Sequence, residues 1–263
     1  MKRCTLLVLA LVLCLAATPA AAQAILYIPA DDRPVNLDYV VDTARAAGLD
    51  ILTPPRPLLG SRSAPGCPEG LWRWLFAEAP AADAVVASAD ALLYGSLVAS
   101  RTHDFPAAVL AERLQGFARL KAANPGLRLY VFSTIMRTPQ ASAGGTEPDY
   151  YETYGPSIFR ITALRDKAET AGLTRGEDAE LKDLLAHVPA GALADWHDRR
   201  EKNLRANFAL ISYVRDGTFS YLVQGRDDCS PYSRSHQESR LLARQSVGLP
   251  ASRYATFPGA DQL

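Results

Sequence analysis

The sequence predicts an α/β fold with a largely parallel sheet. Short apolar runs alternate with helical patterns, and turn residues or polar clusters follow most of the runs. The predicted strands are Ile25–Ala30, Asp50–Thr53, Ala84–Ala87, Leu127–Ser133, Tyr221–Gln224 and Tyr254–Phe257. Runs of this length, bounded by turn residues and followed by helical patterns, are typical of buried parallel strands.

Helical patterns connect the predicted strands in order. The first helix begins near Pro34 and stops at Gly48, and the second carries the apolar positions of residues 71–76. The third spans Pro106–Ala123 and ends at Asn124-Pro125-Gly126, while the last covers about Ser235–Ser246. Proline near the start and glycine or Asn-Pro-Gly after the end are the usual helix boundary signals.

The connection between the fourth and fifth strands predicts a helical insertion at about residues 149–215. Its helical stretches are Ile158–Ala171, Arg175–Ala186 and Ala192–Val214. Insertions that follow strand ends often form lids or substrate walls. Tyr150, Tyr151 and Tyr154 at the start of this insertion would supply aromatic contacts.

We expect the strands to form a (β/α) barrel-like arrangement that is incomplete at the C-terminus. The chain stops at Leu263 soon after the sixth strand, and an eight-stranded barrel would need two more units. The alternative is an open doubly wound sheet, which accommodates six strands. Residues 23–263 would form a single α/β domain whose C-terminal part is missing.

The first 22 residues predict a secretory signal peptide. A basic start, Met1-Lys2-Arg3, precedes an apolar stretch, Leu6–Ala17, and the small residues Ala20-Ala21-Ala22. This pattern is typical of a cleaved signal and is too short for a spanning helix. We therefore expect a secreted or periplasmic protein without a membrane span.

Composition and cysteine usage exclude several classes. Lys plus Arg equals Asp plus Glu, at 28 each, so no basic excess favours a nucleic-acid partner. Cys67 and Cys229 have no nearby Cys or His for a zinc site, and their pairing stays open. No Gly-rich phosphate loop follows the first strand, so we expect no nucleotide cofactor.

Charged and polar residues follow the predicted strands, where α/β folds collect ligands. The predicted substrate-binding residues are Asp31, Asp32, Arg33, Asp90, Tyr94, Arg101, Arg137 and Asp261. For the aspartates, the competing interpretation is capping of the helix that follows each strand. A metal held by Asp31, Asp90, Asp228 and Asp261 is a further alternative, although their spacing does not support it.

Asp227 and Asp228 are the predicted catalytic pair. They follow the fifth strand and precede Pro231-Tyr232. Two neighbouring carboxylates tend to separate their pKa values, which leaves one as the acid and one as the base. Asp228 would be the acid or base and Asp227 the orienting group. The competing interpretation is that Asp227 pairs with Arg226 or Arg137 while Asp228 caps the next helix.

Several blocks resemble the bacterial domain-of-unknown-function family 4127. The segment Ile28–Asn36 is similar to its N-terminal signature. Further blocks are Pro54-Pro55 with Leu59-Gly60, Ser88–Arg101, Ile135–Pro139, Gln224–Asp228 and Gly259–Asp261. Members are usually longer, and Gln262 stands where the family pattern has an acidic residue. The resemblance implies no established activity.

Three functions remain open from the residues. The first is a secreted hydrolase that acts on a carbohydrate or cell-wall glycan through its strand-end carboxylates. The second is a non-catalytic protein that binds a small polar ligand or glycan. The third is a metal-dependent hydrolase of another substrate.

Overall fold

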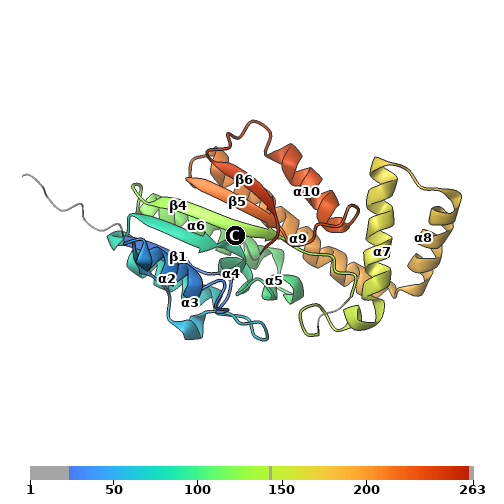
Figure 1. The fold of residues 1–263 in the computed structure, drawn as a ribbon, viewed down its shortest axis with the longest axis horizontal. Coiled ribbons are helices and arrows are strands. Elements are labelled where there is room, and N and C mark those ends of the chain that lie inside the picture. Colours follow the sequence, from blue (N-terminus) through green and yellow to red (C-terminus); the bar gives the residue numbers. More distant parts are fainter. Residues whose placement is uncertain (1–23, 142–143, 261–263) are drawn as a thin grey trace, which may run out of the picture.

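The computed structural model describes residues 24–141 and 144–260. Its centre is a six-stranded sheet in which all neighbouring strands pair in parallel (Figure 1). The strands are β1 (Ala24–Ile28), β2 (Asp50–Leu52), β3 (Ala84–Ser88), β4 (Arg128–Ile135), β5 (Tyr221–Arg226) and β6 (Tyr254–Pro258). The predicted α/β class with alternating strands and helices is confirmed.

The sheet is open, as in the alternative that the sequence predicted, and is not closed into a barrel. Its strand order is β2-β1-β3-β4-β5-β6, because the chain crosses back over β1 between β2 and β3. A barrel needs each strand to pair with the next one in the chain. The order reverses between β1 and β3, and such a switch point is where open α/β sheets bind ligands, at the carboxyl ends of the strands.

Helices fill the connections between the strands. Those that pack on the sheet or beside its edge are α2 (Asp38–Ala46), α3 (Pro68–Glu78), α4 (Ala89–Tyr94), α5 (Ala99–Thr102), α6 (Ala107–Ala123), α9 (Ala190–Arg215) and α10 (Arg234–Gln245). Helices α6 and α9 pack against each other behind the sheet (Figure 1). The main core joins their buried side chains, Phe117, Leu120, Leu210 and Ile211 among them, to the strands.

The first helix begins later than predicted. Residues after β1 form turns, and α2 starts at Asp38 rather than near Pro34. The cause is local, because the Asp31 carboxylate accepts hydrogen bonds from Arg33 and from Asn36 Nδ2, the latter at 2.6 Å. A side chain that binds nearby donors in this way competes with helix formation.

Polar side chains connect the sheet to α9. Ser133 of β4 and Gln224 of β5 are paired in register. The Ser133 hydroxyl and Gln224 Nε2 both donate to Asn207 Oδ1, at 2.9 Å each. Asn207 Nδ2 donates to the Thr134 carbonyl at 3.1 Å. Buried polar groups need such partners, so this network fixes α9 in one position on the sheet.

The helical insertion divides into two parts. Helices α7 (Tyr150–Thr170) and α8 (Arg175–His187) form a hairpin that extends away from the sheet (Figure 1). An apolar cluster that includes Tyr151 of α7 and Trp196 of α9 joins the hairpin to the start of α9. Helix α9 instead packs on β4 and β5, so it is the crossover helix of the fold. The predicted lid function of the insertion remains a prediction.

The predictions on the signal peptide, the membrane span and the cysteines have different outcomes. The predicted signal peptide, residues 1–22, and Asp261 lie outside the described residues. Within the described ranges, no helix has both the length and the apolar composition needed to cross a bilayer. Cys67 and Cys229 are both free thiols.

Candidate functional site

Three loops meet at the carboxyl edge of the sheet and are joined by backbone hydrogen bonds. The Leu97 amide donates to the Ala30 carbonyl at 3.0 Å, which joins the turn between α4 and α5 to the loop after β1. The Asp32 amide donates to the Gly60 carbonyl at 2.8 Å, which joins the loop after β2 to the same place. These bonds hold the switch point of the sheet in one arrangement.

Glycines allow this close approach. A Cβ at Gly60 would lie 2.5 Å from the Gly95 carbonyl oxygen, closer than side-chain carbons come to such an atom. Gly95 ends α4 with a φ of 104°, a left-handed conformation that glycine adopts without strain. The two glycines therefore let the loop after β2 lie directly against the end of α4.

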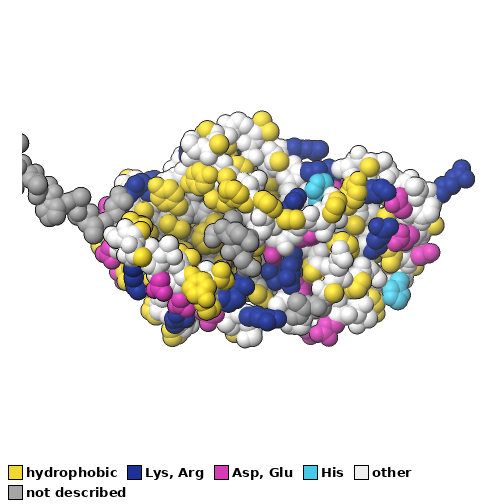
Figure 2. Space-filling view, viewed as in Figure 1, with side chains coloured by type: hydrophobic (Ala, Val, Ile, Leu, Met, Phe, Trp, Pro, Cys, Tyr) yellow, Lys and Arg dark blue, Asp and Glu magenta, His cyan; other side chains and the backbone are white. Residues whose placement is uncertain are grey.

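A pocket of about 290 Å³ lies at this edge, and we call it the arginine pocket. Its polar wall consists of Arg33, Arg62, Arg101, Arg137, Thr146 and Asp227. Arg101 comes from α5, and the other residues come from the loops after β1, β2, β4 and β5, so distant parts of the chain build one wall. Basic side chains gather near the middle of the molecule in Figure 2, where the strands end in Figure 1.

Buried carboxylates hold two of the arginines. Asp31, which is 1 % exposed, accepts from Arg33 Nε at 2.9 Å through both of its oxygens. Glu147, also buried, accepts from Arg137 Nε at 2.7 Å. Pairs of this kind fix the plane of the guanidinium group. The two side chains are therefore held in place before any ligand arrives.

Arg101 is the most buried of the four arginines, with 7 % of its surface exposed. Its Nη2 donates to Asp227 Oδ2 at 2.6 Å, whereas its Nε has no hydrogen-bond partner within the described ranges. Burial, with help from neighbouring Arg137, lowers the pKa of the Arg101 guanidinium. A buried donor without a partner is costly, so Arg101 Nε is, within the described part of the chain, an unsatisfied donor beside the pocket.

Asp90 lies behind this pair. Its Oδ2 accepts from the Thr134 amide at 2.9 Å and from the Thr134 hydroxyl at 3.0 Å. Burial, together with the charge of Asp227, raises the pKa of Asp90 to about 7 despite these hydrogen bonds. Asp90 does not cap α4, because the Ser88 hydroxyl takes the cap position. The Asp90 carboxyl can therefore hold or lose a proton near neutral pH.

This raised pKa predicts a pH effect on stability. The folded state keeps a proton on Asp90 between about pH 4 and pH 7, while the unfolded chain has lost it. Stability should therefore fall as the pH rises through this window, by up to about 1.4 kcal/mol per pH unit, and level off above it. Urea unfolding at pH 5 and pH 8 should show this loss in the natural protein and not in Asp90→Asn. An equal pH dependence in both proteins would contradict the assignment.

The structure brings together only part of the predicted site. Arg33, Arg101, Arg137 and Asp227 share the arginine pocket, with Asp31 and Asp90 directly behind it. Tyr94 lies instead in a neighbouring pocket, where it stacks on His103. Asp32 joins the loops through its backbone amide.

The two members of the predicted catalytic pair have different surroundings. Asp227 lines the arginine pocket, whereas Asp228 is not among the residues that line it. Asp228 Oδ1 accepts from the amide and the hydroxyl of Ser230, at 2.8 and 2.7 Å, which makes a local turn. The cap of α10 is Ser233, not Asp228. Asp228 Oδ2 is buried and has no hydrogen-bond partner among the described residues.

Sequence reasoning missed Arg62, Thr146 and Glu147. The last two belong to the segment Gly144–Pro148, which lies directly before the helical insertion. Both are buried, and both bond to Arg137. The sequence signal that could have indicated them is the polar pair Thr146-Glu147 between two glycines and a proline. Among the described residues, no three His, Cys, Asp or Glu side chains gather to hold a metal ion.

Comparison with known proteins finds a match to a family model. No curated protein and no solved structure matches the chain. The family model described as "Protein of unknown function (DUF4127)" matches residues 25–263, which include every described strand except the first residue of β1. The chain therefore belongs to the DUF4127 family.

Proposed function

We propose that this protein binds a small ligand carrying a carboxylate or phosphate group in the arginine pocket. The observation that carries the proposal is Arg101, a buried guanidinium whose Nε faces no acceptor within residues 24–141 and 144–260. Arg33, Arg62 and Arg137 line the same pocket. The signal-like sequence of residues 1–22 supports binding outside the cytoplasm as part of the same proposal.

The chemistry of the wall supports an anionic ligand. Guanidinium groups bind carboxylates and phosphates through pairs of parallel hydrogen bonds, and Arg33 and Arg137 are already oriented by Asp31 and Glu147. The wall holds four arginines and one aspartate. Its position at the switch point of an open α/β sheet is the usual place for a ligand.

A hydrolase is the second candidate, and Asp90 with Asp227 favours it. Asp227 lines the pocket, and its charge contributes to the raised pKa of the Asp90 carboxyl behind it. A carboxylate that lines the pocket beside a carboxyl of raised pKa is an arrangement that acid–base hydrolysis can use. The pocket supports Asp227 better than Asp228 as the group that contacts a substrate.

Binding of simple anions tests the proposed function. Isothermal titration calorimetry with inorganic phosphate and with acetate should detect at least one of them. We expect Arg101→Gln and Arg137→Gln each to weaken this binding by about tenfold or more, because each removes charge-assisted hydrogen bonds.

The control is Arg205→Gln on the exposed face of α9. Arg205 is 70 % exposed and pairs with Glu201, away from the pocket. Its replacement should leave anion binding unchanged. Equal affinities in all three variants, or no binding of either anion to the natural protein, would refute the proposal.

A further inference from the structure

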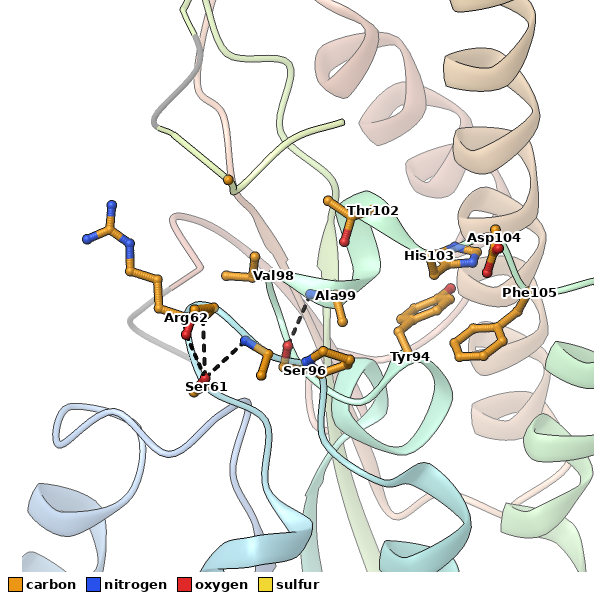
Figure 3. Close-up of a pocket in the computed structure, with 14 residues that line it drawn as sticks. Ser61, Arg62, Tyr94, Ser96, Val98, Ala99, Thr102, His103, Asp104 and Phe105 are labelled. Atoms are coloured by element: carbon orange, nitrogen blue, oxygen red, sulfur yellow. Dashed lines mark hydrogen bonds between the residues drawn. The ribbon is translucent and has the colours of Figure 1, made fainter. Parts of the chain in front are cut away.

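A second pocket adjoins the arginine pocket. It measures about 250 Å³, and we call it the hydroxyl pocket (Figure 3). The two pockets share Arg62 and Val98 as lining residues, so they lie side by side. Each is smaller than the range of about 300–1,000 Å³ that is common for small-molecule sites, and the two joined fall within it.

The hydroxyl pocket has a different chemistry from its neighbour. Ser61, Ser63, Ser96 and Thr102 line it, together with the ring of Tyr94. The Ser96 oxygen accepts from the Ala99 amide at 3.0 Å, which leaves its hydroxyl hydrogen to donate. Hydroxyl groups both donate and accept, so this wall, which also includes Asp104, suits a ligand part that carries hydroxyls of its own.

His103 adds a fixed acceptor at the far end of this pocket. Asn203 Nδ2 donates to the Ser100 carbonyl, so Asn203 Oδ1 faces His103 Nε2 at 2.8 Å and accepts a hydrogen bond from its N–H. Burial lowers the pKa of His103 to about 4, so the ring is uncharged at neutral pH. Its Nδ1 is then a bare acceptor, and it has no hydrogen-bond partner among the described residues.

Aromatic neighbours fix the orientation of this ring. His103 stacks on Tyr94 with 4.6 Å between ring centroids and on Phe105 with 5.7 Å (Figure 3). The Arg113 guanidinium covers the Phe105 ring, 4.1 Å from its centroid. The imidazole therefore cannot turn freely, and among the described residues its Nδ1 stays a buried, unpaired acceptor beside this end of the pocket.

We propose that the two pockets together form one site for an acidic sugar, that is, a sugar ring bearing a carboxylate or a phosphate. The anionic group lies against Arg101 and Arg137, and the ring hydroxyls lie against Ser96, Thr102 and the His103 end. This inference rests on the proposed anion binding and adds the class of ligand to it.

The test compares acidic sugars with their separate parts. Calorimetry on the whole chain would use glucuronate, glucose 6-phosphate, glucose, acetate and inorganic phosphate as probes. We expect at least one acidic sugar to bind about tenfold or more tightly than the matching bare anion, because two or three added hydrogen bonds are worth that much. Comparing the affinity for glucuronate with that for glucose 6-phosphate shows whether the site prefers a carboxylate or a phosphate.

A side chain that fills the hydroxyl pocket should remove the extra affinity of acidic sugars over bare anions. Thr102 is exposed at the end of α5, so Thr102→Trp adds a ring at the pocket without disturbing the core. The variant should bind acidic sugars no better than bare anions. The matched control is Thr170→Trp, at the exposed end of α7 and away from both pockets.

The outcomes separate this inference from the proposed function. If bare anions bind and acidic sugars bind no better, the acidic-sugar inference is wrong and anion binding stands. If Thr102→Trp still binds acidic sugars as much more tightly than bare anions as the natural protein does, the hydroxyl pocket does not hold the sugar ring. The inference then fails as well. If neither a bare anion nor an acidic sugar binds, both proposals fail together.

Discussion

Replacing Arg200 by methionine is expected to destabilise the fold by about 3–5 kcal/mol, because it removes one partner of a buried ion pair. Arg200 is 1 % exposed and its Nη2 donates to Glu238 Oε2 at 2.6 Å. Its guanidinium also donates to the carbonyls of Met136 and Arg137, at 2.7 and 2.8 Å. The change leaves Glu238 and both carbonyls without this donor. Urea unfolding measures the loss.

Helix α9 supplies a matched control for this prediction. Arg205 pairs with Glu201 one turn further along the same helix, with 70 % and 47 % of the two side chains exposed. Arg205→Met should cost no more than about 0.5 kcal/mol, since water screens an exposed pair. A cost for Arg200→Met below about 1 kcal/mol would show that the buried pair is not a main support of the fold.

A second replacement tests the physical reason. In Arg200→Met combined with Glu238→Leu, both charges are gone and no carboxylate is left buried without Arg200. Because the cost of breaking such a pair comes largely from the charge left behind, the double variant should be more stable than Arg200→Met alone. Arg234 also bonds to Glu238, so part of the loss should remain.

If the protein is a hydrolase, Asp227→Asn should lower its turnover by about a hundredfold or more. Asp227 lines the arginine pocket, and loss of a general acid or base costs about this much. Asp228→Asn should have a much smaller effect, since Asp228 makes a local turn with Ser230 and does not line the pocket. The assay is hydrolysis of a panel of acidic glycosides and sugar phosphates, with and without EDTA.

Folding must be checked separately in this experiment, because Asp227 is bonded to Arg101. Circular dichroism and urea unfolding would show whether the Asn variants fold normally. Unchanged turnover in a folded Asp227→Asn would eliminate the catalytic role and leave anion binding. A loss in Asp228→Asn equal to that in Asp227→Asn would instead restore the adjacent pair predicted from the sequence.

The sequence located the strands well, since buried strands are read from local patterns. The six predicted strands match β1 to β6 to within about two residues at each end. Apolar run length and turn residues are properties of a few neighbouring positions, and they were sufficient here. The start of α2 was placed too early, because the Asp31–Asn36 hydrogen bond forms only when the loop folds back on itself.

The predicted site was correct in part for a similar reason. Strand ends place Arg33, Arg137 and Asp227 at one edge of a parallel sheet, and this follows from chain direction alone. The sequence could not tell which side chain pairs with which. Arg101 lies 126 positions from Asp227 in the chain, and their contact depends on the packing of α5 against the sheet edge.

The sequence by itself thus determined the α/β class, the order of the elements and the edge at which charged side chains collect. Only the tertiary structure decided that the sheet stays open, that Asp227 and Asp228 have different surroundings, and that Glu147 holds Arg137. The reason is that local periodicity sets secondary structure, whereas strand order, burial and ion pairing depend on contacts between residues far apart in the chain.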